Sequence, residues 1–191
     1  MEIEKRSQNG KLATEEAEKD SYIVTGYAST FEPYRLFEKR GITYFEKVEP
    51  TAFRNADMSD VIFQYDHTDK VLARTTNGTL KLDVDERGLK VTADLSSTKA
   101  SRELYEEIRS GLVNQMSFGF TVKKDMFEKR SNTRIITELD RIFDVSAVSR
   151  PANPDTNISA RSYISAIEEE QEQLNKKRKL LRLKLEFDTN Q

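Results

Sequence analysis

Hydrophobic and polar residues alternate in short runs through most of residues 21 to 150. The runs "YIVTGYASTF", "ITYFEKV", "VIFQYDH", "TLKLDV" and "LKVTADL" are rich in β-branched and aromatic residues, which favours strands. "DVDERGLKV" predicts a hairpin whose turn spans Asp85 to Gly88. A further long strand or strand pair, "TRIITELDRIFDVSAV", ends at the prolines of "SRPANPDTN". The pattern predicts a mainly β fold.

Two helices are expected beside these strands. In "SSTKASRELYEEIRSGLV", Leu104, Ile108 and Leu112 recur at helical spacing, Ser101 suits the N-cap, and Gly111 suits the end. From about Ile158 the chain contains neither Gly nor Pro, which predicts a second helix. Its apolar residues follow an interrupted heptad seam: Ile164, Ile167, Gln171, Leu174, Arg178, Leu181 and Leu185. This helix either packs on its own domain or frays in solvent, or it binds a partner helix or scaffold.

Length and composition restrict the organisation of the chain. Its 191 residues suit one domain with tails, which we place as a flexible arm at 1–20, a domain at 21–160 and a charged helix or tether at 161–191. With 31 basic and 33 acidic residues, the net charge of −2 favours a protein partner over nucleic acid or a membrane surface. No apolar run is long enough for a secretory signal or membrane span, so we expect neither.

The stretch "NQMSFGF" has an unusual composition for a strand. Met116, Phe118 and Phe120 alternate with polar or small residues, which is the pattern of a half-buried strand. Ser117 and Gly119 then lie on the opposite face. Glycine inside a strand often marks the close approach of another backbone or a ligand. We therefore expect this face to be kept open, unless Ser117 is only a small polar filler.

The single histidine, His67, closes the run "VIFQYDH". On a continuous strand it would share a face with Val61, Phe63 and Tyr65, at the edge of the core, where a structural role is the ordinary alternative. Without cysteine or a second histidine, a zinc site has too few ligands, and we expect no metal ion or cofactor. A serine needs a base such as histidine to become a nucleophile, so His67 and Ser117 form a candidate pair. "QMSFG" lacks the glycine two positions before serine that an α/β-hydrolase requires.

Several stretches together resemble one protein family. "GYASTFE", "FEKVEPTAF", "QYDHTDKVLART", "GLVNQMSFGF" and "DVSAVSRPANP" occur in the order found in the prohead, or capsid maturation, proteases of tailed bacteriophages. The resemblance implies a mainly β domain with flanking helices (α+β), closed or nearly closed into a β-barrel like that of the herpesvirus assembly proteases. It also implies a serine endopeptidase that cuts the internal scaffold of an immature capsid.

The resemblance assigns His67 and Ser117 as general base and nucleophile. The herpesvirus relatives use a second histidine, which this chain lacks, so an acid must take its place; the phage family's acid matches Asp144. Glu138 and Asp140 share its strand parity and stay alternatives. Asp144 is flanked by Ile142, Phe143 and Val145, where an unpaired carboxylate would cost several kcal/mol, so we expect it to have a partner: the imidazole, the backbone, Arg141 or Arg150.

The remaining expectations concern substrate and partners. The loop "SRPANP" is where the resemblance places oxyanion donors; Arg150 is the candidate, because Pro151 has no N–H, and Gly119 is a second candidate for oxyanion or substrate contact. The expected partners are the major capsid protein with its scaffold segment and further copies of the chain. The expected location is the host cytoplasm, inside the procapsid. The competing hypotheses are a non-catalytic assembly protein that acts through its C-terminal helix and a ligand-binding barrel.

Overall fold

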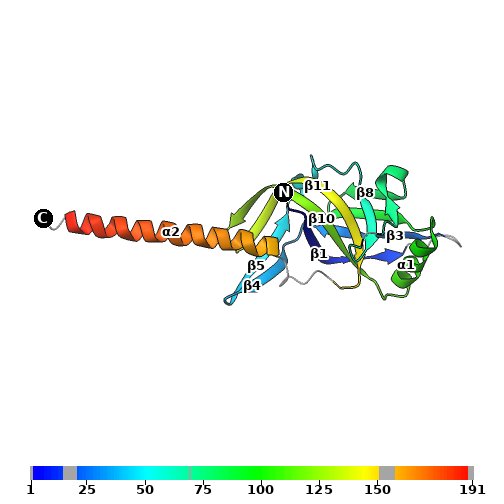
Figure 1. Ribbon diagram of the computed structural model, residues 1–191, viewed down its shortest axis with the longest axis horizontal. Helices are drawn as coiled ribbons and strands as arrows, with labels where there is room; N and C mark the ends of the chain where they lie inside the picture. Colours follow the sequence, from blue (N-terminus) through cyan, green and yellow to red (C-terminus); the bar gives the residue numbers. More distant parts are fainter. Residues whose placement is uncertain (1, 15–20, 69, 151–157, 189–191) are drawn as a thin grey trace. The chain divides into compact units, whose positions relative to one another are not determined.

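The protein is described from a computed structural model, which covers residues 2–14, 21–68, 70–150 and 158–188 (Figure 1). The chain divides into two units, Met1–Thr156 and Asn157–Gln191. In the described residues, the first unit contains eleven strands, helix α1 and two short 3-10 helices (Pro50–Phe53 and Thr75–Asn77), and the second contains helix α2 (Ile158–Asp188). The bounds of the strands are β1 Glu4–Lys11, β2 Ala13–Thr14, β3 Ile23–Thr30, β4 Tyr34–Lys39, β5 Ile42–Val48, β6 Ile62–Tyr65, β7 Ala73–Arg74, β8 Leu80–Val84, β9 Gly88–Asp94, β10 Gln115–Glu128 and β11 Thr133–Val148. The expected mainly β architecture with flanking helices is confirmed.

The strands of the first unit form two sheets. A seven-stranded sheet has the order β1-β10-β11-β5-β4, with β6 paired to both β11 and β7. A four-stranded sheet has the order β2-β3-β9-β8. Among the described strands neither sheet closes on itself, so the expected barrel is not supported. The chain crosses between the two sheets several times, first at Leu12 between β1 and β2, and no strand pairing found among the described residues joins them.

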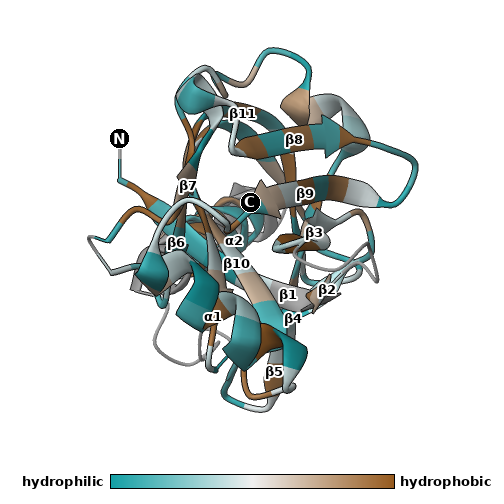
Figure 2. Cartoon of the chain, turned by 90° about the vertical axis from the view of Figure 1, so that its right-hand side faces the viewer, coloured by the Kyte–Doolittle hydropathy of each residue, from teal (hydrophilic) through white to brown (hydrophobic). Residues whose placement is uncertain are grey.

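The core lies between the apolar faces of the two sheets. It includes Phe63, Phe118 and Phe120 from the larger sheet and Leu89 and Val91 from the smaller one, all fully buried. Substitution of one of these phenylalanines by alanine would lower the free energy of unfolding by about 3–5 kcal/mol. Figure 2 shows the hydrophobic segments of these strands interspersed with hydrophilic ones, as alternation requires.

Helix α1 (Lys99–Arg109) packs Leu104 and Ile108 on this core. Its N-cap is Thr98, whose hydroxyl accepts the backbone N–H of Ser101 at 3.0 Å, so the expected cap at Ser101 is wrong. Ser101 instead lies inside the helix. Gly111, with a φ of 80°, ends the helix region as predicted, because glycine adopts this left-handed conformation without steric cost. Leu112 follows and is 75% exposed, contrary to the expected apolar face.

The expected flexible arm of residues 1–20 is wrong for Glu4–Lys11, which form β1 and pair antiparallel with β10. Residues 1 and 15–20 lie outside the described part of the chain. The strand contains little apolar sequence, but Glu4 and Arg6 are buried against charges from distant strands. Periodicity of hydrophobic residues does not reveal a strand of this kind, because its side chains are stabilised by ion pairs and its backbone by the ladder.

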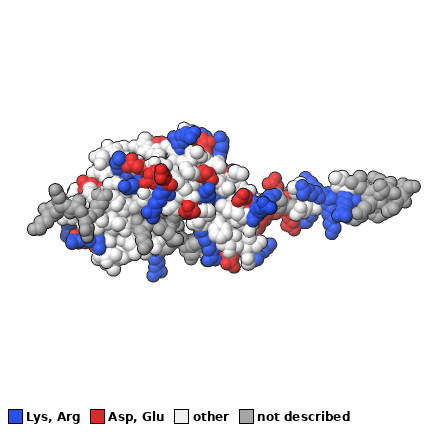
Figure 3. All heavy atoms as spheres, turned by 180° about the vertical axis from the view of Figure 1, so that it is seen from behind, with Lys and Arg blue, Asp and Glu red and all other residues white. Residues whose placement is uncertain are grey.

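The second unit is helix α2, as its composition predicts. Acidic residues Glu168–Glu170 and Glu172 precede a basic group, Lys176–Lys179 with Arg178 among it, and Figure 3 shows these two groups separately along the helix. On the face of the first unit visible in Figure 3, acidic and basic side chains are interspersed. On this helix Leu174, Leu180 and Leu181 are exposed. The expected binding of a partner helix or scaffold to its heptad seam stays a prediction. No described helix has the length and apolar character that crossing a membrane requires.

Candidate active site

Ser117 lies near the start of β10, between β1 and β11. Its cross-strand neighbours are Ser7 on β1 and Ser146 on β11. The side chain is fully buried, and every residue from Met116 to Thr121 is buried as well. The expected half-buried strand with one open face is therefore wrong, because the face that carries Ser117 and Gly119 is covered by polar groups of neighbouring elements.

The space beside Gly119 is occupied by Asp144. The two residues are direct cross-strand partners in the antiparallel β10–β11 pair. A Cβ atom added to Gly119 would lie 2.2 Å from Asp144 Oδ2. This explains the glycine in "NQMSFGF": it makes room for a carboxylate of the same protein. Gly119 therefore serves the placement of Asp144, and its expected oxyanion or substrate contact stays a prediction.

Gly119→Ala is expected to lower activity by about a hundredfold, because displacement of a positioning group by about 1 Å has an effect of this size. The added methyl must push the Asp144 carboxylate away. An activity assay and a thermal unfolding curve measure the effect. As a control, the same substitution in an Asp144→Asn background should cost much less, since both changes act on one group. Wild-type activity in a folded Gly119→Ala variant would contradict this account.

His67 does not belong to a strand. Strand β6 begins at Ile62 and ends at Tyr65, and Asp66 and His67 follow in left-handed backbone conformations with φ of 48° and 52°. The expected continuous strand face through His67 is therefore wrong. Asp and His are among the non-glycine residues that tolerate this region best. The turn redirects the chain, so that the imidazole points toward β10 and β11.

The turn is fastened to the end of β11. The N–H of Asp66 donates to the carbonyl of Ala147 at 2.9 Å. The Asp66 carboxylate accepts from the N–H and the hydroxyl of Ser149, both at 2.8 Å. Because β6 also pairs with β11 in parallel, from Ile62 opposite Asp144 onward, the histidine and the acid are held on one framework. Sequence reasoning did not find this role of Asp66, although an Asp before a histidine in a turn is a recognisable signal.

Three side chains then form a continuous hydrogen-bonded chain. His67 Nε2 lies 2.7 Å from Ser117 Oγ, and His67 Nδ1 lies 2.6 Å from Asp144 Oδ1. The His67 and Asp144 side chains are 13% and 7% exposed. Residues from three elements, β10, β11 and the turn after β6, thus meet in one place.

Ser146 is a fourth member that sequence reasoning missed. Its hydroxyl donates to Asp144 Oδ1 at 2.8 Å and lies 3.2 Å from His67 Nδ1. A carboxylate buried this deeply needs such donors. Ser146 is two residues after Asp144 and therefore shares its strand face, which is the one signal in the sequence that could have identified it.

The other candidate residues lie elsewhere. Glu138 pairs with Lys123 and Lys124 at 2.7 and 2.8 Å, and these partners hold the pKa of its carboxyl below the usual value. Asp140 is exposed and accepts from Thr121 at 3.2 Å. Arg150 is exposed just beyond β11, and the loop that follows it lies outside the described residues. None of the hydrogen bonds or ion pairs found in the described part of the chain joins these three to His67 or Ser117.

A hydroxyl, an imidazole and a carboxylate linked in this order are the arrangement that serine hydrolases, serine peptidases among them, use on several unrelated folds. The profile of the Caudovirus prohead serine protease family matches residues 8–173, and the chain belongs to this family. The resemblance inferred from the sequence is thereby confirmed.

Among curated proteins, the chain is similar to the prohead protease of Enterobacteria phage HK97. The two are 28% identical over 155 residues, which is 76% of this chain. The match spans 63% of the relative's length, less than two thirds of it. No solved structure matches the chain.

Proposed function

We propose that this protein is the serine endopeptidase of phage head maturation, in which Ser117 is the nucleophile, His67 the general base and then acid, and Asp144 the group that orients His67. The single observation that carries the proposal is the hydrogen-bonded chain from Ser117 through His67 to Asp144. Membership of a prohead protease family supports the same reading. The proposed substrate is the scaffold portion of the major capsid protein, together with the protease itself, inside the procapsid.

The geometry supports a two-step reaction. Ser117 Oγ attacks the peptide carbonyl carbon while its proton moves to His67 Nε2, and His67 then returns that proton to the leaving amine. Water hydrolyses the resulting ester, again with His67 as base, which restores the serine hydroxyl. Asp144 accepts the Nδ1–H throughout, which keeps Nε2 available and stabilises the imidazolium.

Two elements of the proposal lie away from this chain of hydrogen bonds. The N–H of Arg150 is the proposed oxyanion donor, as its place just after β11 allows. Self-association of the protein is also proposed. The competing function is a non-catalytic assembly protein that acts through α2, which the separated acidic and basic groups and the exposed leucines of that helix support.

The test is incubation of the purified chain with the capsid precursor of the same virus, read by intact mass. A fluorophosphonate, which reacts covalently with activated serines, is applied in parallel. We expect removal of the scaffold segment from the capsid protein and a single label on the peptide that contains Ser117. An uncut precursor together with an unlabelled Ser117 would favour the non-catalytic function.

A further inference from the structure

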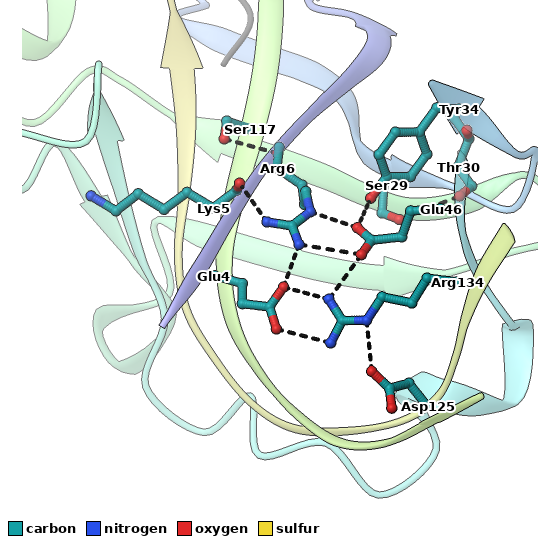
Figure 4. A network of polar contacts seen from close by, with 10 residues as sticks. All are labelled: Glu4, Lys5, Arg6, Ser29, Thr30, Tyr34, Glu46, Ser117, Asp125 and Arg134. Atoms are coloured by element: carbon teal, nitrogen blue, oxygen red, sulfur yellow. Dashed lines mark hydrogen bonds and ion pairs between the residues drawn. The ribbon is translucent and has the colours of Figure 1, made fainter. Parts of the chain in front are cut away.

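The N-terminal strand β1 covers the proposed nucleophile. It runs antiparallel to β10, with Glu4 opposite Phe120, Arg6 opposite Phe118 and Ser7 opposite Ser117. The hydroxyl of Ser117 lies 2.8 Å from the carbonyl oxygen of Arg6, within hydrogen-bonding distance. Figure 4 marks this contact between Ser117 and Arg6 with a dashed line. The peptide bond between Arg6 and Ser7 is thus the one next to the nucleophile.

The side chain of Arg6 enters a carboxylate site in the body of the protein. Arg6 Nε donates to Glu46 Oε1 at 2.5 Å, and Nη2 donates to Oε2 at 3.2 Å. Glu46 is fully buried on β5 and also accepts from the hydroxyl of Tyr34 on β4. A paired fork of this kind recognises guanidinium by both charge and shape.

Glu4, two residues earlier on the same strand face, enters a guanidinium site. Arg134 on β11 donates to its carboxylate from Nη1 at 2.7 Å and from Nη2 at 3.1 Å. Arg134 also bridges to Glu46 at 3.0 Å and to Asp125 at 2.6 Å, which keeps it in place (Figure 4). Although burial opposes its charge, these hydrogen bonds and nearby carboxylates hold the pKa of Arg134 above its usual value.

Extended peptides commonly bind proteases and other partners by adding a strand to a sheet, with pockets that read alternate side chains. Strand β1 has this geometry, and its carbonyl group lies at the nucleophile. We propose, on the basis of the function proposed above, that β1 occupies the protein's own substrate groove, and that this groove selects peptides with an acidic residue, any residue and then a basic residue, cut after the basic one. Glu46 reads the basic side chain and Arg134 reads the acidic one.

The same contact makes the described state an inhibited one. The hydroxyl of Ser117 has one hydrogen, yet both the Arg6 carbonyl and His67 Nε2 lie within hydrogen-bonding distance of its oxygen. When that hydrogen is donated to the Arg6 carbonyl, it is not available to His67 Nε2, so the base cannot take it. Ser117 is then neither deprotonated nor reachable by another peptide.

The first test measures substrate selection. The full chain is given a fluorogenic peptide that contains Glu-Lys-Arg-Ser. Three further peptides have Gln in place of the Glu, in place of the Arg, or in place of both. Each replacement should lower kcat/KM by about tenfold or more, because it removes a charged hydrogen-bond partner of a buried receptor residue, Glu46 or Arg134. The products should show a cut between Arg and Ser by mass. Equal cleavage of all four peptides would overturn the proposal.

The second test loosens β1 in the full chain. Glu4→Gln combined with Arg6→Gln removes both receptor contacts, while Lys5→Gln removes one charge from a side chain that points away from the groove and is exposed. The rate of fluorophosphonate labelling at Ser117 should rise about tenfold or more in the double variant, since loss of charged contacts favours dissociation of the strand. It should stay unchanged in Lys5→Gln. Equal labelling rates in these two variants would overturn the proposal.

A receptor variant separates the two pockets. Glu46→Gln should reduce the preference for Arg over Gln at the basic position and leave the preference at the acidic position in place. If Glu46→Gln does not fold, the peptide series and the β1 variants still test the proposed groove. A self-cut between Arg6 and Ser7, seen as loss of residues 1–6, would support the proposed register, and a self-cut elsewhere in residues 2–14 would overturn it.

Failure of this proposal differs from failure of the proposed function. If the chain cuts the capsid precursor and labels at Ser117 but shows no charge preference, only the groove assignment is wrong. If no variant labels and no substrate is cut, the peptidase assignment is wrong, and the groove assignment with it.

Discussion

Ser117→Ala is expected to lower peptidase activity by about six orders of magnitude, the effect known for loss of the nucleophile in another serine protease. The reason is that alanine has no oxygen to attack the carbonyl group, so no acyl-enzyme forms. The fold should persist. Only one hydroxyl is removed, and the hydrogen bond it donates to the Arg6 carbonyl contributes about 1 kcal/mol.

The measurement is cleavage of a peptide substrate and of the capsid precursor, with circular dichroism and thermal unfolding to verify the fold. Ser101→Ala is the matched control, because Ser101 is also a fully buried serine, with a hydroxyl that donates to Leu72 at 3.0 Å in another part of the molecule. It should keep near-normal activity. A folded Ser117→Ala variant that processes the capsid protein at the wild-type rate would refute the assignment of the nucleophile.

Asp144→Asn is expected to lower activity by up to about four orders of magnitude while the protein still folds, as for an orienting aspartate in another serine protease. The amide is nearly the same size as the carboxylate, so the packing against Gly119 is kept. However, an amide cannot stabilise an imidazolium, and its NH₂ group favours the tautomer of His67 in which Nε2 carries the hydrogen and cannot accept one.

Glu138→Gln and Asp140→Asn are the controls for this variant, and each should change activity by less than about tenfold. The lysine partners of Glu138 and the exposure of Asp140 place both acids away from His67. All three variants are measured on one peptide substrate. A large loss at Glu138 or Asp140, with Asp144→Asn near wild type, would assign the acid elsewhere. Equal small losses at all three would indicate a serine and histidine pair without an acid.

Local patterns in the sequence were enough for several elements. The apolar, β-branched and aromatic runs predicted most strands between Ile23 and Val148, although not β4 or the two-residue β7. The hairpin at Asp85–Gly88 forms because the Asp85 carboxylate accepts the N–H groups of Arg87 and Gly88 at 2.8 and 3.1 Å. These features depend on residues that are close in the chain, or on the burial of one face of a strand against the core. The motifs around His67, Ser117 and Asp144 were likewise sufficient to identify the family.

Other features depended on contacts between distant residues. Whether the sheets close into a barrel is decided at their edges, where strand pairing depends on long-range geometry that no run of residues encodes. The bulges between β10 and β11 change which residues lie opposite one another, so strand parity alone could not separate the three acids. The left-handed turn at Asp66 and His67 likewise ended a strand that alternation had extended by two residues.

The sequence by itself determined the composition of the strands, the two helices, the family and the residue types available for chemistry, because these follow from local propensity and from motifs. Only the tertiary structure decided that Gly119 makes room for Asp144 and that β1 covers Ser117. The partners of β1 lie 40 residues away for Arg6 with Glu46 and 130 residues away for Glu4 with Arg134. A polar strand held by charges so distant in the chain has no hydrophobic period, and its place becomes visible only when the sheets have formed.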